Sequence, residues 1–205
     1  MRKGLILILG ASGYVGSRLL IRLAGEGYQM RSLVRERRKI AEGSMPPGQI
    51  VEGDVLQAET LDAAFEGVET VYYLIHSMKA GEKGFDERDR VAATHVVRAA
   101  DRAGVERIIY LGGLGRRDVL QSPHLRSRHE VGDLLRSGNA RVTEFRAAVI
   151  LGSGSASFEM MHHLVNRLPI MICPRWVTVH TQPIAIDDCG SFPRERSGGF
   201  RAICK

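Results

Sequence analysis

The sequence predicts an α/β fold built on a doubly wound parallel sheet. The first observation is an unbroken aliphatic run, Leu5–Leu9, as expected for a strand that is buried on both faces. The second is that glycines at positions 10, 13 and 16 follow this run and lead into an amphipathic stretch, 17–24, which gives strand, tight turn and helix. The third is a regular alternation of strand-like and helix-like segments that continues to residue 151.

The glycine turn has the spacing Gly-x-x-Gly-x-x-Gly, with Ala11 where the generic dinucleotide-binding fingerprint has its second glycine. Gly10 allows a sharp exit from the strand, Gly13 lets a ligand phosphate approach the backbone, and Gly16 lets the helix pack closely on the sheet. The free N–H groups and the positive end of the helix would then face a bound pyrophosphate. The alternative is a strand–helix turn that binds no ligand.

The composition is that of a globular protein, with 44% hydrophobic and 25% charged residues among 205. No stretch approaches the length of a membrane span. The net charge is +6, but no nucleic-acid-binding motif accompanies it, which favours a solvated basic surface over a nucleic-acid partner. Three late, widely spaced cysteines suggest neither a disulfide framework nor a zinc site, so we expect no metal and a cytoplasmic location.

The second strand, Tyr28–Val34, ends at a residue that decides cofactor choice in folds of this kind. An acidic residue there binds the ribose hydroxyls of NAD, whereas an arginine pairs with the 2′-phosphate of NADP. Arg35 is the best candidate, supported by Arg37 or Arg38, so NADP(H) is preferred. Glu36 keeps NAD(H) possible, although it stands one position late. The alternative is an exposed basic loop.

The third strand, Gln49–Glu52, leads into a second candidate contact. In this position the Asp54 side chain can meet the adenine amino group while Val55 packs on the ring. The alternative for Asp54 is a helix N-cap or a turn, and the two roles do not exclude each other. Residues 57–66 are expected to form an amphipathic helix that ends at Gly67.

The fourth strand lies within 69–76, and its carboxyl end carries Leu74 and His76. Ligands of open parallel sheets bind at that end, so His76 can touch the nicotinamide-side ribose or simply face solvent. A long helix, Phe85–Ala103, precedes strand five, Ile108–Leu111. Ser122 is expected to cap the next helix, which ends near residue 136, and 142–151 is the sixth strand.

With these segments in place, the sequence resembles the atypical extended short-chain dehydrogenase/reductase family, near its NmrA-like branch of NAD(P)-binding proteins. One bacterial subgroup of oxidoreductases looks especially similar, and the resemblance covers about residues 3–188. It implies a Rossmann-type fold, an NAD(P)-dependent oxidoreductase or epimerase-type protein, and a small-molecule substrate that it does not identify. The stretches that carry it are 10–16, Arg35, 53–55 and 104–111, and, for the subgroup, 73–78, 123–128 and 152–159.

The chain departs from the family at the catalytic positions. Active members use a serine after strand five and a Tyr-x-x-x-Lys pair on the next helix, whereas this chain has Gly112-Gly113 and then His124 and Arg128 at the same spacing. His124 can act as an acid/base near neutral pH. Arg128 can bind ribose or phosphate but, being permanently charged, cannot carry a proton. The alternative is that the usual catalysis has been lost.

We expect an NAD(P)-binding domain over 1–151 and the start of a substrate-binding portion over 152–188, including a helix at Ala156–Arg167 and extended pieces at 169–174, 176–179 and 183–188. After Asp188 the pattern is lost where the family continues with a helix. We therefore expect 189–205 to be an irregular tail, the result of truncation or of a change of reading frame.

The leading hypothesis is an NADP(H)-dependent oxidoreductase acting on a small carbonyl or apolar compound, with His124 and Arg128 at its catalytic centre. The rival is a non-catalytic NADP(H)-binding redox sensor that regulates a partner. The oligomeric state is left open. The residues predicted to bind the cofactor are Gly10, Ser12, Gly13, Tyr14, Val15, Gly16, Arg35, Arg37, Asp54, Val55, Leu74 and His76.

Overall fold

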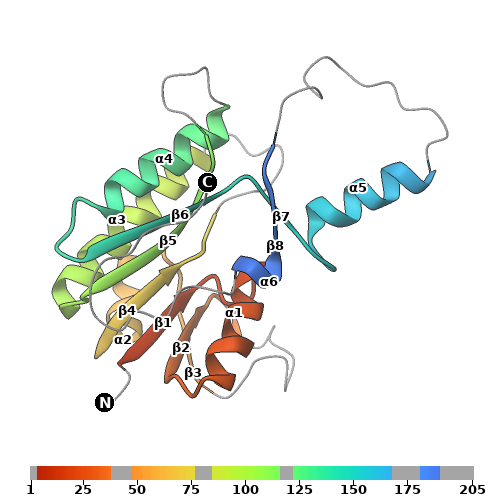
Figure 1. Ribbon diagram of the computed structural model, residues 1–205. Helices are drawn as coiled ribbons and strands as arrows, with labels where there is room; N and C mark the ends of the chain where they lie inside the picture. Colours follow the sequence, from red (N-terminus) through yellow and green to blue (C-terminus); the bar gives the residue numbers. More distant parts are fainter. Residues whose placement is uncertain (1–3, 38–47, 77–84, 116–121, 168–180, 190–205) are drawn as a thin grey trace. The chain divides into compact units, whose positions relative to one another are not determined.

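The computed structural model describes residues 4–37, 48–76, 85–115, 122–167 and 181–189 (Figure 1). The chain divides into two compact units, Met1–Arg146 and Ala147–Lys205. In the described part of the chain, no helix has both the length and the apolar character needed to cross a membrane.

The first unit is a six-stranded parallel sheet with helices packed against it, in the strand order β3-β2-β1-β4-β5-β6. Figure 1 shows α1 on one side of this sheet and α3 and α4 on the other. The predicted α/β fold with a doubly wound parallel sheet is therefore confirmed. The strands are β1 (Leu5–Leu9), β2 (Met30–Val34), β3 (Gln49–Glu52), β4 (Val68–Tyr73), β5 (Arg107–Gly113) and β6 (Arg141–Ala147). The helices are α1 (Tyr14–Gly25), α2 (Asp62–Phe65), α3 (Phe85–Ala103) and α4 (Pro123–Leu135).

Strand β1 lies in the middle of the sheet, and its side chains Leu7, Ile8 and Leu9 are completely buried. Complete burial of consecutive residues means that both faces are covered, which explains why the strand is aliphatic without alternation. The register aligns Leu9 with Leu33 of β2 and with Tyr73 of β4. These three strands therefore end at one level, and the loops that follow them share one edge of the sheet.

The predicted helix over 57–66 is wrong in its extent. A 3₁₀ turn, η2 (Ala58–Thr60), comes first, and α2 has only four residues. The physical reason is Thr60, whose hydroxyl donates to the carbonyl oxygens of Asp54 and Gln57 and accepts the amide of Asp54. These local side-chain bonds stabilise a turn in place of the first helical turn.

The predicted sixth strand is also wrong in part, because it breaks at Ala148. β6 ends the central sheet, whereas β7 (Val149–Leu151) pairs in parallel with β8 (Pro183–Ala185) in a separate sheet of the second unit. The residue pattern shows that a segment is extended but not which strand it pairs with. The same unit contains α5 (Ala156–Arg167), as predicted. The extended piece predicted over 183–188 is correct only as far as Ala185, because the short helix α6 (Ile186–Cys189) begins there with two acidic residues in its first turn. The expected extended pieces at 169–174 and 176–179 and the tail after Cys189 lie outside the described residues.

Candidate functional site

The glycine turn leaves β1 as predicted. Gly10 has a φ of +92°, a conformation that side chains with a Cβ rarely adopt. A Cβ at this position would also lie 3.0 Å from the carbonyl carbon and oxygen of Leu74, just beyond β4. Two separate constraints, backbone angle and close approach of the neighbouring strand end, therefore require glycine here.

Gly16 makes a different contact from the one predicted. A Cβ at Gly16 would stand 2.2 Å from the carbonyl oxygen of Gly10 and 2.9 Å from the Cα of Ala11. Both are backbone atoms of the turn itself, so Gly16 lets the helix pack against the turn, not against the sheet. The turn and the first turn of α1 are thus fixed to one another.

The beginning of α1 is arranged as an anion-binding end. Its N-cap is Gly13, which supplies no side-chain cap, and no acidic residue stands in the first turn. Ser12 and Gly13 are exposed. Because the first N–H groups of a helix have no partner within it, an exposed, uncapped start presents donors and a positive dipole end outward.

Tyr14 and Val15 form the first turn of α1 and are half-buried. The Tyr14 ring lies under the guanidinium of Arg18, 3.9 Å from its carbon atom. The Tyr14 hydroxyl oxygen is buried, and within the described ranges it has no hydrogen-bond partner. Buried hydroxyls nearly always have one, so Tyr14 is an exception at the start of α1.

Arg35 and Arg37 follow β2, and both are exposed. The register of β1 and β2 brings this loop beside the glycine turn. Across the residues that the structure describes, neither guanidinium has a hydrogen bond or an ion pair. The amide of Arg37 donates to the Glu52 carboxylate at 3.4 Å, which fixes the loop backbone to the end of β3.

Asp54 and Val55 follow β3 at the same edge. The Asp54 carboxylate accepts the amide of Leu56 at 3.0 Å, so it shapes a turn, and its second oxygen is the one available to a ligand. Val55 is 8% exposed and belongs to the core. Its carbonyl oxygen lies 2.9 Å from Nδ1 of His95, which gives that histidine a structural contact.

Leu74, just after β4, is half-buried, and its amide donates to the carbonyl oxygen of Leu9 at 3.0 Å.

The structure brings His124 and Arg128 of α4 to the ends of β4 and β5. Ser122 caps α4 as predicted, accepting the amide of Leu125 at 3.3 Å. Arg128 is only 6% exposed. Its guanidinium donates to the carbonyl oxygens of Ile75, at 3.2 Å, and of Leu111. The structure therefore shows Arg128 bound to two backbone carbonyls, and its contact with ribose or phosphate stays a prediction.

His76 and His124 share one electrostatic environment. Burial, the charge of Arg128 and the proximity of His124 lower the pKa of His76 below its usual value. Burial and Arg128 likewise lower the pKa of His124, and the carboxylates of Asp89 and Asp86 oppose this only weakly. Both imidazoles are therefore neutral at neutral pH.

The lowered histidine pKa values predict a pH dependence of stability. Because the unfolded chain, with an ordinary histidine pKa of 6.5, binds protons that the folded chain does not, stability is complete above that value and falls as the pH drops through the lowered pKa values. We expect the double variant His76→Gln/His124→Gln to lose less stability than the wild type between about pH 7 and about pH 5, measured by urea unfolding. The exposed His162→Gln variant is the control, and equal losses in all three proteins would contradict the expectation.

The space where the family has a serine is filled by other side chains. A Cβ on Gly112 would lie 2.6 Å from a carboxylate oxygen of Glu144, and one on Gly113 would lie 2.9 Å from Leu125. The absence of a side chain at Gly112 and Gly113 therefore leaves space that the Glu144 carboxylate and the Leu125 side chain occupy.

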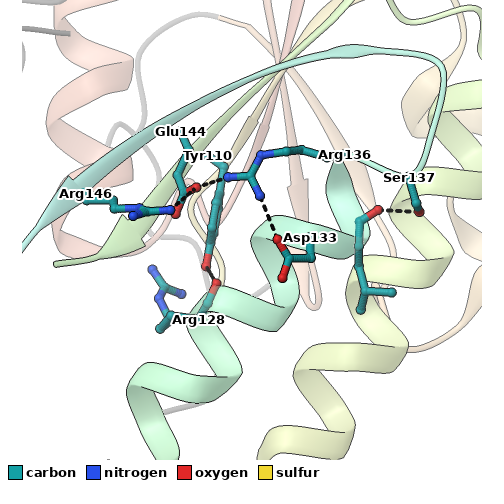
Figure 2. A network of polar contacts seen from close by, with 8 residues as sticks. Tyr110, Arg128, Asp133, Arg136, Ser137, Glu144 and Arg146 are labelled. Carbon is teal, nitrogen blue, oxygen red and sulfur yellow. Dashed lines mark hydrogen bonds and ion pairs between the residues drawn. The ribbon is translucent and has the colours of Figure 1, made fainter. Parts of the chain in front are cut away.

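Glu144 was not singled out in the sequence, and it is the centre of a polar network between β6 and α4 (Figure 2). Its side chain is 7% exposed and lies between Arg146, at 2.9 Å, and Arg136. Arg136 also pairs with Asp133 at 2.9 Å. The sequence did contain one signal: Glu144 and Arg146, with opposite charges, are two residues apart and therefore share one face of the predicted strand. The sequence pattern could not show that this face lies opposite Gly112.

The residues present fit the phosphates of a dinucleotide. The uncapped helix start, the close-packed glycine turn and two exposed arginines stand along one edge of the sheet. Backbone donors suit a pyrophosphate and guanidinium groups suit a further phosphate.

Comparison with known proteins agrees with this geometry. A family model described as NAD(P)H-binding matches residues 10–149. The Photosystem II assembly factor Ycf39 of Cyanophora paradoxa is 28% identical over 69% of this chain and 44% of its own length. The ceramide reductase of Caulobacter vibrioides is 26% identical over 82% of this chain and 53% of its own length. The chain thus spans about half the length of these two relatives.

Solved structures show the same fold. The UDP-glucose 4-epimerase of Thermotoga maritima covers 91% of this chain, and this chain covers 71% of it, with a TM-score of 0.72 and 16% identity, a likeness of fold alone. The triphenylmethane reductase of Citrobacter sp., complexed with NADP(H), has a TM-score of 0.62 and 25% identity over 71% of this chain and 50% of its own. The family model covers well over half of the sequence. The chain therefore belongs to the NAD(P)H-binding family, as its resemblance to the extended short-chain dehydrogenases/reductases predicted.

Proposed function

We propose that this chain binds NADP(H) in preference to NAD(H) and forms the cofactor-binding part of an oxidoreductase that acts on a small carbonyl or apolar compound. The observation that supports this best is the pair of exposed guanidinium groups, Arg35 and Arg37, beside an uncapped helix start. The first N–H groups of α1 would hold the pyrophosphate, and the two arginines the 2′-phosphate. The distribution of cysteines favours the cytoplasm as its location.

The adenine and nicotinamide ends would lie on either side of the glycine turn. The second carboxylate oxygen of Asp54 would accept a hydrogen bond from the adenine amino group. Val55, the next residue, is part of the hydrophobic core. At the other end, Leu74 and His76 follow β4, and His124 on α4 lies close enough to act electrostatically on His76. NADPH, when bound, supplies a hydride equivalent, and the protein must supply the proton.

His124 is the proposed proton donor. Its imidazole must be protonated to act, and its pKa is lowered, so turnover should rise as the pH falls below the usual histidine pKa of 6.5. We expect His124→Ala to reduce turnover by about 100-fold or more at unchanged NADPH affinity, since general acids contribute at least that much. The measurement is NADPH oxidation in the presence of a panel of aldehydes and ketones. Unchanged turnover in the variant would exclude His124 as the donor.

Calorimetric titration of the wild-type chain with NADPH and NADH tests the binding proposal. Tighter binding of NADPH is expected, and absence of binding to both would overturn the proposal. The second candidate function is the non-catalytic redox sensor, which is favoured by the occupation of the serine space by Glu144 and Leu125. A chain that binds NADPH yet oxidises it with no carbonyl compound would support the sensor.

A further inference from the structure

Arg128 joins three elements of the first unit at one point. It belongs to α4, and its guanidinium donates to Ile75, beyond the end of β4, and to Leu111 in β5. Peptide carbonyls at strand ends need a partner when they are buried, and a planar guanidinium can serve two of them at once. A lysine ammonium lacks the two separate N–H groups in one plane that bind two carbonyl oxygens at once.

Tyr110 fixes the same residue from the opposite direction (Figure 2). Its hydroxyl donates to the carbonyl oxygen of Arg128 at 2.8 Å, and the Arg128 guanidinium lies 5.3 Å from the centre of its ring. Tyr110 is completely buried, and Tyr73 of β4 packs on it edge to face, with ring centres 5.7 Å apart. Side chain and backbone of Arg128 are thus both tied to β5.

Arg128 is linked to both histidines, to His76 through the carbonyl of Ile75 and to His124 through helix α4. Ile75, whose carbonyl it binds, directly precedes His76, and His124 stands one helical turn before Arg128 on α4. A movement of Arg128 would therefore displace both imidazoles.

We propose that Arg128 is a positioning residue that holds His76 and His124 close together by tying α4 to the ends of β4 and β5. The inference uses the proposed function only for the statement that these strand ends receive the cofactor. The charged groups that act on the two imidazoles are Arg128 itself and, from α3, Asp86 and Asp89. Asp89 is buried and accepts the hydroxyl of Ser127 at 3.0 Å, which ties α3 to the residue before Arg128.

The test compares Arg128→Met, Arg128→Lys and, as a matched control, Arg126→Met. Arg126 is exposed on the same helix, two residues away. NMR titration of the two imidazoles reports their pKa values, and calorimetry with NADPH reports the affinity. In Arg128→Met both pKa values should rise and the affinity should fall about tenfold, the upper end of what the loss of one neutral hydrogen bond costs. Arg126→Met should leave both unchanged.

Arg128→Lys separates charge from geometry. The ammonium keeps the charge, so the histidine pKa values should stay low, but it cannot span both carbonyls, so the NADPH affinity should still fall about threefold or more. If Arg128→Met does not fold, the NADPH affinity of Arg128→Lys tests the inference, and an affinity equal to that of the wild type would overturn it. Imidazole pKa values and an NADPH affinity that are both unchanged in Arg128→Met would also overturn the inference. If the wild type itself binds no NADPH, the proposed function fails, while the NMR signals of the two imidazoles in Arg128→Lys, where the charge is kept, still show whether the rings are displaced.

Discussion

Replacing Gly16 with alanine is expected to remove NADP(H) binding and to reduce the free energy of unfolding by about 1–3 kcal/mol, the usual cost of overpacking. The added methyl group would stand 2.2 Å from the Gly10 carbonyl oxygen. That oxygen is a backbone atom and already accepts the amide of Gly13 at 3.0 Å, so it cannot turn aside. Either the turn or the first turn of α1 must move, and each movement displaces the N–H groups that would hold the pyrophosphate.

The matched control is Gly25→Ala at the other end of the same helix. A Cβ on Gly25 would meet nothing within 4 Å. Alanine is a better helix former than glycine, so this variant should be as stable as the wild type or slightly more stable. Urea unfolding and calorimetry with NADPH compare the three proteins. Equal stability and equal affinity in both variants would show that the turn does not depend on the close packing of Gly16.

The sequence was sufficient for elements whose ends carry their own signals. Phe85–Ala103, Ala156–Arg167 and Gln49–Glu52 were predicted with the bounds that the structure has. Each lies between breakers or has acidic residues or a cap at its start. The helix over 57–66 failed because the hydroxyl of Thr60 competes for backbone groups of the preceding turn, a local side-chain effect that hydrophobic periodicity does not contain.

The site was predictable wherever a backbone requirement selects the residue. Only glycine satisfies both the positive φ and the tight approach at position 10, so the turn could be recognised from its spacing. Arg128 was placed on the correct helix face, but four rotatable bonds separate its guanidinium from the backbone, and its partners Ile75 and Leu111 come from distant segments. Such a contact depends on the packed sheet and cannot be derived from spacing alone.

The double variant Arg35→Ser/Arg37→Ser is expected to bind NADPH about 10–100-fold more weakly while its affinity for NADH hardly changes. The range corresponds to the loss of one charge-assisted hydrogen bond in total, about 1.5–3 kcal/mol, because about 1.4 kcal/mol corresponds to a factor of ten. Because both guanidinium groups are exposed, their removal leaves no buried cavity and should have little effect on stability. Calorimetric titration with the two cofactors gives both affinities on the same protein sample.

Arg141→Ser is the control for the loss of positive charge. Arg141 is exposed at the start of β6, so it lies at the edge of the sheet opposite to the strand ends that form the candidate site. It pairs with Glu106 at 3.9 Å, a surface contact of small energetic value.

If the 2′-phosphate is recognised locally, only the double variant loses NADPH affinity, and added salt should reduce this loss only slightly. An equal loss in Arg141→Ser would instead mean that the net charge of +6 attracts the cofactor through long-range electrostatics, which salt screens strongly. Equal weakening of NADPH and NADH in the double variant would remove Arg35 and Arg37 from the choice of cofactor.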